Sequence, residues 1–200
     1  MKLIDSMLYE LWYIFCAGGG PFYDIDKRNS MSRVIQQTCT PEEFVAMVDL
    51  LSEIPTTFEH NGQTINFKEK EHELKYGLSQ EFLGYIYEKR FLGNQFVNEY
   101  LNTTLRRSSD NTYLIDLIGC TSNLGLVNTL ICILNKKNEQ RVLNSIRTII
   151  ELHYDTYGLQ NETLVDKMLE QNRQSVLYPF LVESVHADKD AVQKGILHTK

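Results

Sequence analysis

The chain has 200 residues and a formal charge of −6, with 42% hydrophobic and 23% charged residues. This is the composition of an ordinary globular protein and excludes overall disorder, and its acidic balance disfavours non-specific nucleic-acid binding, which depends on lysine and arginine. A chain of this length buries roughly 70% of the surface of its unfolded form, so it needs no disulfide or metal to fold.

The cysteines and the apolar runs bear on localisation. No two cysteines form a C-x-x-C pair, so we expect reduced thiols rather than a zinc site or a disulfide framework. The longest apolar run, residues 124–134, is shorter than the roughly 18 residues that a membrane span needs. The N-terminal segment carries Asp5 and Glu10, unlike a signal peptide. We therefore expect a cytoplasmic protein without a membrane span, a metal or a cofactor. The cysteines are Cys16, Cys39, Cys120 and Cys132.

The N-terminal segment 3–16 has apolar residues at helical spacing, and the sequence GGGPFYDID follows it. A phosphate-binding loop needs a preceding strand and a Lys-Ser/Thr pair, and both are missing here. In nucleotidyltransferase-like folds a helix lies between a Gly-Gly pair and a metal-binding acid pair such as Asp24 and Asp26, and here only three residues separate Gly20 from Asp24. We therefore predict that Gly18–Gly20 and Pro21 form a turn that binds no nucleotide.

The next elements are a weak helix over residues 27–38 and a strongly marked helix over 40–55. Thr40 suits the N-cap position, Pro41 the first helical position and Glu43 the return arm of a capping box.

Residues 56–67, TTFEHNGQTINF, carry Asn-Gly between two alternating runs of β-forming residues. This is a strong signal for a β-hairpin with a two-residue turn. A turn at Asn61–Gly62 pairs His60 with Gln63 and Phe58 with Ile65, and it also pairs Thr56 with Phe67.

The rest of the chain is predicted to be helical. A charged connector over 67–75 precedes a long helix over 79–106, in which Gly84 and Gly93 mark close packing or a bend. Further helices are expected over 112–119 and 124–135, along an apolar stripe from Val142 to Tyr157 that ends at Gly158, and over 162–186 with a break near Pro179. No internal repeat is apparent.

These elements predict a mainly α protein, a multi-helix bundle with one β-hairpin near residues 56–67. We expect an N-terminal helix–helix–hairpin lobe over 1–75, a helical bundle lobe over 76–186 packed against it, and a loose tail over 187–200.

No motif in the sequence predicts catalytic residues. Glu69 and His72 form a single E-x-x-H pair, whereas helical di-iron sites use two such motifs and further carboxylates. His153 lies on the apolar stripe, where a core histidine is more typical than a ligand. There is no G-x-S-x-G sequence, and no cysteine lies in an electropositive context. Catalysis by residues scattered along the chain stays open.

The order of helices and hairpin over 27–68 resembles a winged helix in architecture. The resemblance implies a recognition helix at 41–53 and a wing at 56–67. That helix carries Glu42, Glu43, Asp49 and Glu53 and no lysine or arginine, so it would repel DNA. The resemblance thus implies a contact with protein, as in small subunits that accompany chromosome-organising or other ATPases.

We therefore predict a non-catalytic protein–protein interaction protein: an inhibitor, an immunity-type factor or a small accessory subunit. Its partner-binding residues are predicted to be Glu42, Asp49 and Glu53, which suit a partner protein with a basic surface. An unrecognised enzyme is the third hypothesis.

The second hypothesis is a nucleic-acid-associated regulator or subunit. It uses either the winged-helix-like lobe or the basic stretch over 101–150, where 6 basic and 3 acidic residues give a net charge of +3. The candidate contacts in this stretch are Arg106, Arg107, Lys136 and Lys137.

Overall fold

The computed structural model describes residues 38–52, 54, 57–60, 62–66 and 71–196. The predictions for the first helix and the glycine-rich turn, Gly18–Pro21, lie outside the described residues. The described part is mostly helical with one two-stranded antiparallel sheet, which confirms the predicted mainly α class and the helical bundle with a hairpin. The chain divides into two compact units: unit 1 ends at Phe91 and unit 2 begins at Leu92.

In the described part of unit 1, the ring of Phe44 is fully buried. The centroid of this ring lies 5.1 Å from that of Phe91 and 6.2 Å from that of Tyr87, so one aromatic cluster joins the helix that carries Phe44 to the helical turns that end at Phe91. The described elements are α3 (Pro41–Asp49), β1 (Thr57–His60), β2 (Gln63–Asn66), α4 (Glu71–Tyr76) and the π-helical η2 (Gly77–Gly84) and η3 (Tyr87–Phe91).

Helix α3 begins as predicted and ends earlier. The Thr40 hydroxyl accepts from the Glu43 amide at 3.2 Å, and the Glu43 carboxylate accepts from the Thr40 amide at 2.8 Å, so the capping box is confirmed. The predicted helix over 40–55 is too long, because α3 stops at Asp49 and residues 50–52 form a turn. The Lys75 ammonium donates to the Ser52 carbonyl at 3.4 Å and satisfies an acceptor that a continuing helix would have used.

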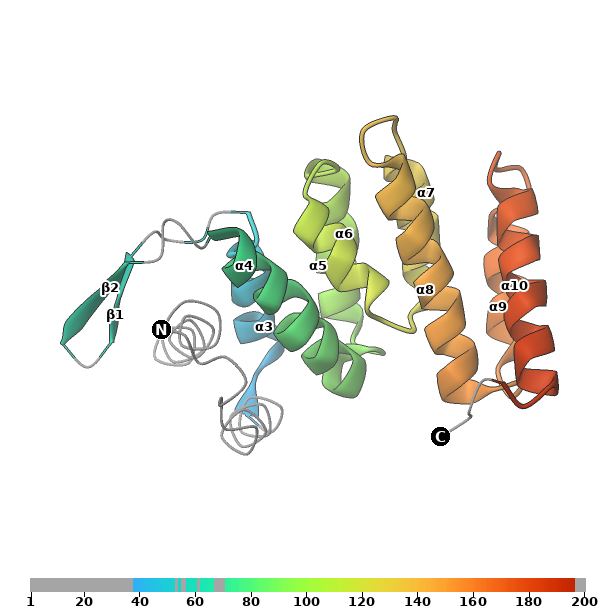
Figure 1. The fold of residues 1–200 in the computed structure, drawn as a ribbon, viewed down its shortest axis with the longest axis horizontal. Helices are drawn as coiled ribbons and strands as arrows, with labels where there is room; N and C mark the ends of the chain where they lie inside the picture. The colour runs from blue at the N-terminus through green and yellow to red at the C-terminus, as the bar shows by residue number, and fades with distance from the viewer. Residues whose placement is uncertain (1–37, 53, 55–56, 61, 67–70, 197–200) are drawn as a thin grey trace. The chain divides into compact units, whose positions relative to one another are not determined.

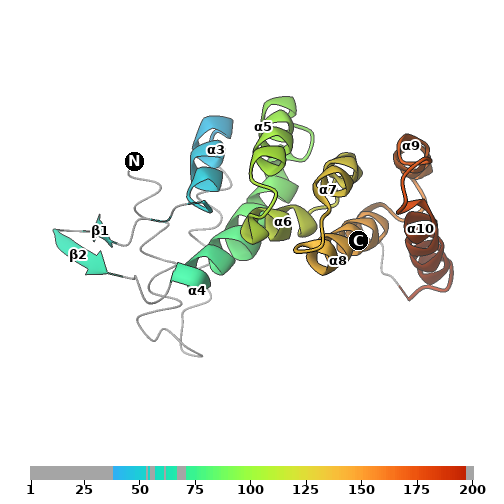
Figure 2. The same cartoon turned by 90° about the horizontal axis from the view of Figure 1, so that it is seen from above.

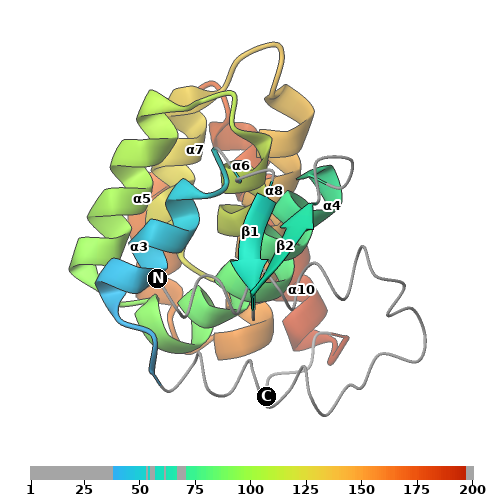
Figure 3. The ribbon, with the colours of Figure 1, turned by 90° about the vertical axis from the view of Figure 1, so that its left-hand side faces the viewer.

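The hairpin has the predicted register. His60 pairs with Gln63 and Phe58 with Ile65, and the arrows of β1 and β2 run antiparallel in Figure 3. The side chains of Phe58 and Ile65 are both buried, as expected for residues on one face of the sheet. The predicted outer pair, Thr56 with Phe67, lies outside the described residues.

We expect Gly62→Val to lower the free energy of unfolding by about 1 kcal/mol or more. Gly62 has φ 76°, in the left-handed region, and a β-branched side chain resists this conformation even though the space around the glycine is open. Gly62→Asn is the matched control, because asparagine tolerates the left-handed region. Urea unfolding of both variants checks this, and an equal loss in both would contradict the backbone explanation.

Unit 2 consists of three successive helix pairs arranged in two rows. Helices α5, α7 and α9 form one row and α6, α8 and α10 form the other, and neighbouring helices within each row contact one another (Figures 1 and 2). Stacked helix pairs of this kind are the architecture of α-solenoids. The elements are α5 (Gln95–Arg107), α6 (Thr112–Gly119), the 3₁₀ turn η4 (Leu124–Leu126), α7 (Val127–Ile133), α8 (Glu139–Tyr157), α9 (Glu162–Gln171) and α10 (Tyr178–Gln193).

The predicted single helix over 79–106 is interrupted before unit 2. The chain turns at Leu92–Gly93, and the Asn94 side chain then caps α5 by accepting from the Val97 amide at 3.0 Å. Gly93 therefore lies at a bend, which is one of the two roles, close packing or a bend, that the sequence predicts for it. The helical stripe that ends at Gly158 is also confirmed, because α8 stops at Tyr157 and Gly158 has φ 55°.

Helix α10 is longer than the sequence predicts. The break in the predicted helix over 162–186 falls at residues 172–177, and Pro179 lies in the first turn of α10. The tail expected to be loose from Ala187 is helical up to Gln193. An ion pair of 2.7 Å between Lys189 and Glu162 ties this part of α10 to the start of α9. Within the described ranges, no helix is long and apolar enough to cross a membrane.

Candidate functional site

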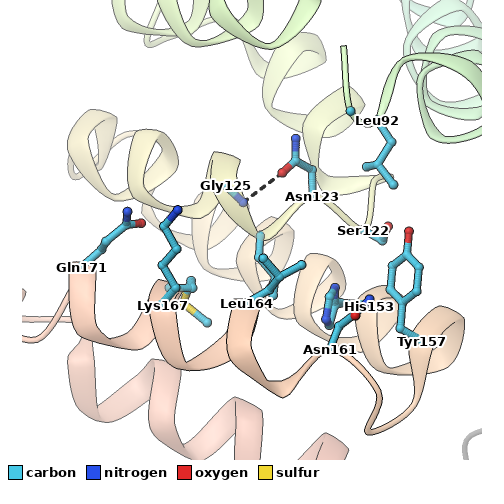
Figure 4. A pocket seen from close by; sticks show the side chains of 13 residues that line it. Leu92, Ser122, Asn123, Gly125, His153, Tyr157, Asn161, Leu164, Lys167 and Gln171 are labelled. Atoms are coloured by element: carbon cyan, nitrogen blue, oxygen red, sulfur yellow. Dashed lines mark hydrogen bonds between the residues drawn. The ribbon is translucent and has the colours of Figure 1, made fainter. Parts of the chain in front are cut away.

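A pocket of about 460 Å³ opens in unit 2 on the side of α9 that faces η4 (Figure 4). Its volume lies in the range of sites that bind small ligands or parts of larger ones. Four segments supply its walls: the turn before α5, the loop that leads into η4, the C-terminal end of α8, and one face of α9. The lining residues are Leu92, Gly93, Ser122, Asn123, Leu124, Gly125, His153, Tyr157, Asn161, Leu164, Lys167, Met168 and Gln171.

A chain of asparagine side chains fixes the first wall. The Asn123 carbonyl oxygen accepts from the Gly125 amide at 2.9 Å, and its amide nitrogen donates to the Asn98 side chain at 3.2 Å. Asn98 donates in turn to the Leu92 carbonyl at 3.1 Å. The loop before η4 and the turn before α5 are therefore held to the same face of α5.

The second wall is one face of α9. Asn161, Leu164, Lys167 and Gln171 follow one another at intervals of three or four residues, so their side chains project from the same side of the helix. In Figure 4, the side chains of Leu164, Lys167 and Gln171 all extend from α9 toward η4. Leu164 is 49% exposed.

His153 and Tyr157, on successive turns of α8, line the pocket below the loop that leads into η4. His153 is only 2% exposed, and its ring centroid lies 5.0 Å from that of Tyr157. The sequence predicts a core histidine here. The residue is buried in the core, and it also lines the pocket, which the sequence does not indicate.

Several polar groups of the lining have no partner in the part of the chain that the structure describes. Among the described residues, the Tyr157 hydroxyl, the side-chain amides of Asn161 and Gln171, and the Lys167 ammonium form no hydrogen bond or ion pair. None of the lining residues is an aspartate or a glutamate, so Lys167 gives the pocket a positive charge. The pocket thus offers unused donors and acceptors beside apolar side chains.

Of the sequence-predicted partner-binding residues, Glu42 and Asp49 are exposed on α3, and Glu53 lies outside the described residues. The prediction that Asp49 and Glu53 share a helical face depends on a helix that continues past Asp49, and α3 ends there.

The four basic residues of the second hypothesis are brought to one end of the helix pairs of unit 2. Arg106 and Arg107 end α5, and Lys136 and Lys137 lie in the turn before α8. The Asn138 side chain donates to the Ser109 carbonyl at 3.1 Å and holds the two connecting loops together. All four side chains are exposed, and none of them has an ion pair within the part of the chain that the structure describes.

Two of the described thiols are buried and have raised pKa values. Burial and the neighbouring Glu43 carboxylate raise the pKa of Cys39 to about 11, and burial together with Asp116 raises the pKa of Cys120. Both thiols therefore stay protonated at neutral pH. Within the described ranges, no three histidine, cysteine, aspartate or glutamate side chains lie close enough to hold a metal ion.

One carboxyl outside the pocket has a raised pKa. Burial, with a contribution from Glu151, raises the pKa of Asp188 on α10 to about 6, and Arg147 partly opposes the shift. The Asp188 Oδ2 atom is buried without a hydrogen bond among the described residues. The charged form of Asp188 is therefore disfavoured in the folded protein.

We expect Asp188→Asn to stabilise the protein at pH 7.5 and to leave its stability almost unchanged at pH 4. The pKa of Asp188 is higher in the folded state than the 3.8 of an unperturbed carboxyl, so its protonation favours folding at low pH, and this contribution is lost as the pH rises through 6. Because the group is partly exposed, solvent screening limits the gain at pH 7.5 to about 1 kcal/mol. Thermal unfolding of both proteins between pH 4 and 8 checks this; a difference that does not vary with pH would contradict it.

Comparison of the chain with protein-family models, curated proteins and solved structures finds no match. The candidate site therefore rests on the geometry of unit 2 alone. The sequence predicts neither the pocket residues of α9 nor the Asn98–Asn123 contact. The signals in the sequence at these places are the polar GCTSN segment (119–123) between two apolar helices and the polar centre of residues 162–186.

Proposed function

We propose that this chain is a non-catalytic interaction protein, an inhibitor, immunity-type factor or accessory subunit, whose pocket in unit 2 receives a segment of a partner protein. One observation carries the proposal: the pocket groups polar side chains that bond to no described residue around an exposed leucine. Polar groups without partners are costly to cover unless the covering molecule supplies hydrogen bonds, and a bound segment of protein supplies both these and apolar contact.

The arrangement of unit 2 supports the same function. Rows of stacked helix pairs present extended surfaces that are formed by several successive elements, and repeat proteins use such surfaces to bind partners. Here the pocket draws residues from two of the six helices, α8 and α9, and from the turns before α5 and around η4. The comparison with repeat proteins is an analogy of architecture, and it supports the same function as the pocket does.

The chemistry of the lining favours binding over the enzyme hypothesis. An enzyme site for acid–base chemistry typically contains titratable groups whose pKa values are perturbed. The carboxyl with the raised pKa, Asp188, is not among the residues that line the pocket.

Site-specific photo-crosslinking tests the proposal. A photoreactive amino acid at position 164 should form an adduct with one defined protein in extracts of the native host. The same amino acid at position 176, where Val176 is 89% exposed outside the pocket, is the control. The adduct should disappear when Asn161 and Lys167 are both replaced by alanine. Equal adducts from both positions, or none from either, would overturn the proposal.

A second candidate function is favoured by the basic end of the helix pairs. The contact between Asn138 and Ser109 ties the loop that follows Arg106 and Arg107 to the turn that carries Lys136 and Lys137, and clusters of exposed basic residues attract phosphates. We propose nucleic-acid association as the alternative. In an electrophoretic shift at about 50 mM salt, where electrostatic affinity is high, the wild type should bind and a variant with all four residues changed to glutamine should not. Absence of binding by the wild type would remove this alternative.

The exposed acidic residues of α3 remain a further proposed contact with a partner protein. Glu42 and Asp49 are exposed on α3, whose first turn is acidic and whose last turn lacks a basic residue. These residues suit a partner protein with a basic surface. The winged-helix-like arrangement of α3 with the hairpin β1–β2 is likewise a proposal, and its first helix falls in residues outside the described part.

A further inference from the structure

We propose that the pocket of unit 2 binds an extended peptide segment of the partner that carries an aspartate or glutamate beside an apolar side chain. This inference rests on the proposed function and names the chemistry that its pocket selects.

The charge of the pocket points to an acidic residue. Lys167 is the charged side chain of the lining, and no carboxylate of the lining neutralises it. It forms no ion pair with any described residue, and its ammonium extends toward η4 in Figure 4. A carboxylate bound there would form a charge-assisted hydrogen bond in a partly enclosed site, where such bonds are stronger than in open solvent.

The side-chain amides point to a peptide rather than to a phosphate-containing ligand. Asn161 and Gln171 each carry a donor and an acceptor that no described residue uses. Phosphate oxygens only accept hydrogen bonds, so they would leave the amide oxygens without partners, whereas a peptide backbone supplies donors and acceptors in alternation.

The spacing along α9 sets the length of the segment. A helix rises 1.5 Å per residue, so Asn161 and Gln171 are separated by about 15 Å, the length of roughly four or five residues of extended peptide. Lys167 lies between the two amides, which places the acidic residue inside the segment rather than at its end.

The apolar residues of the lining lie close to Lys167 along α9. Leu164 and Met168 lie one helical turn apart on α9, and Leu124 lines the pocket from η4. Leu164 is half exposed, so an apolar side chain of the ligand would bury it. The flexible Met168 suits a site that accepts more than one apolar side chain.

An array of peptides of about five residues tests the inference. In one set, a glutamate–leucine pair is placed at each position of the peptide in turn. Two matched sets carry glutamine or lysine in place of the glutamate. Wild-type protein should retain the glutamate set about tenfold more tightly than the glutamine set. Lys167→Glu should lose this preference and favour the lysine set. Lys89→Glu, which changes an exposed lysine of η3 outside the pocket, should behave as wild type.

Equal retention of all three sets by the wild type would overturn the inference, and so would an equal loss with Lys89→Glu, which would indicate non-specific attraction. Retention of a single-stranded oligonucleotide in place of the peptides would also overturn it. If the array fails while position 164 still forms its specific protein adduct, the peptide chemistry is wrong and the proposed function stands. If both fail, the proposed function is wrong.

Discussion

Phe44→Ala is expected to lower the free energy of unfolding of unit 1 by about 3–5 kcal/mol. The Phe44 side chain is fully buried, and its ring packs against Phe91 and Tyr87 at 5.1 and 6.2 Å. Truncation removes the apolar surface of the ring and leaves a cavity between α3 and η3, which the surrounding helices fill only in part.

Phe96→Ala is the matched control for this prediction. Phe96 is an aromatic residue of the same size in helix α5, and it is 50% exposed. Its truncation should cost less than about 1 kcal/mol. Urea unfolding followed by circular dichroism measures both variants, and a loss for Phe44→Ala no larger than that of the control would contradict the described core.

Gly119→Val should destabilise unit 2 by about 3 kcal/mol, the upper end of the range for overpacked cores. A Cβ atom at position 119 would lie 2.7 Å from Ser145 Oγ, 2.9 Å from Ser145 Cβ and 3.2 Å from Ser145 Cα. The last of these atoms belongs to the backbone, so α6 and α8 must separate. Their separation also disturbs the buried hydrogen bond from Ser145 to the Ile115 carbonyl.

Two further variants isolate the steric cause. Gly93→Ala adds a methyl group where no atom lies within 4 Å, and it should change the stability by less than about 0.5 kcal/mol. Ser145→Gly removes the side chain that collides with residue 119, so it should recover part of the loss in a double variant with Gly119→Ala. If Ser145→Gly and Gly119→Ala destabilise additively, the close approach of α6 and α8 is not the cause.

Local signals in the sequence predicted local structure well. The Thr40–Glu43 capping box and the Asn61–Gly62 turn each depend on residues a few positions apart, and the structure has both the box and the register of the hairpin. The ends of elements were less predictable. Helix α3 stops at Asp49 rather than near Pro55. The Ser52 carbonyl, just after the helix, accepts a hydrogen bond from Lys75, a residue far along the chain.

The rows of helices in unit 2 and their pocket were not predictable in the same way. The three helices of the first row have 13, 7 and 10 residues, so corresponding helices of successive pairs differ in length, and their sequences show no apparent repeat. The pocket depends on contacts such as Asn123 with Asn98 and on the face that α9 presents. Isolated asparagines in the sequence indicate loops and caps, and nothing in their spacing says that they meet.

The central claim is tested most directly by measuring the affinity of the crosslinked partner protein for three purified proteins. These are the wild type, Leu164→Asp and Val176→Asp. Both variants place a carboxylate at an exposed apolar position of unit 2, and only position 164 lies in the pocket. We predict that Leu164→Asp weakens binding at least about tenfold while Val176→Asp binds as the wild type does, with all three proteins unfolding at similar temperatures. Equal affinity of all three proteins would contradict the assignment of the pocket as the partner-binding site.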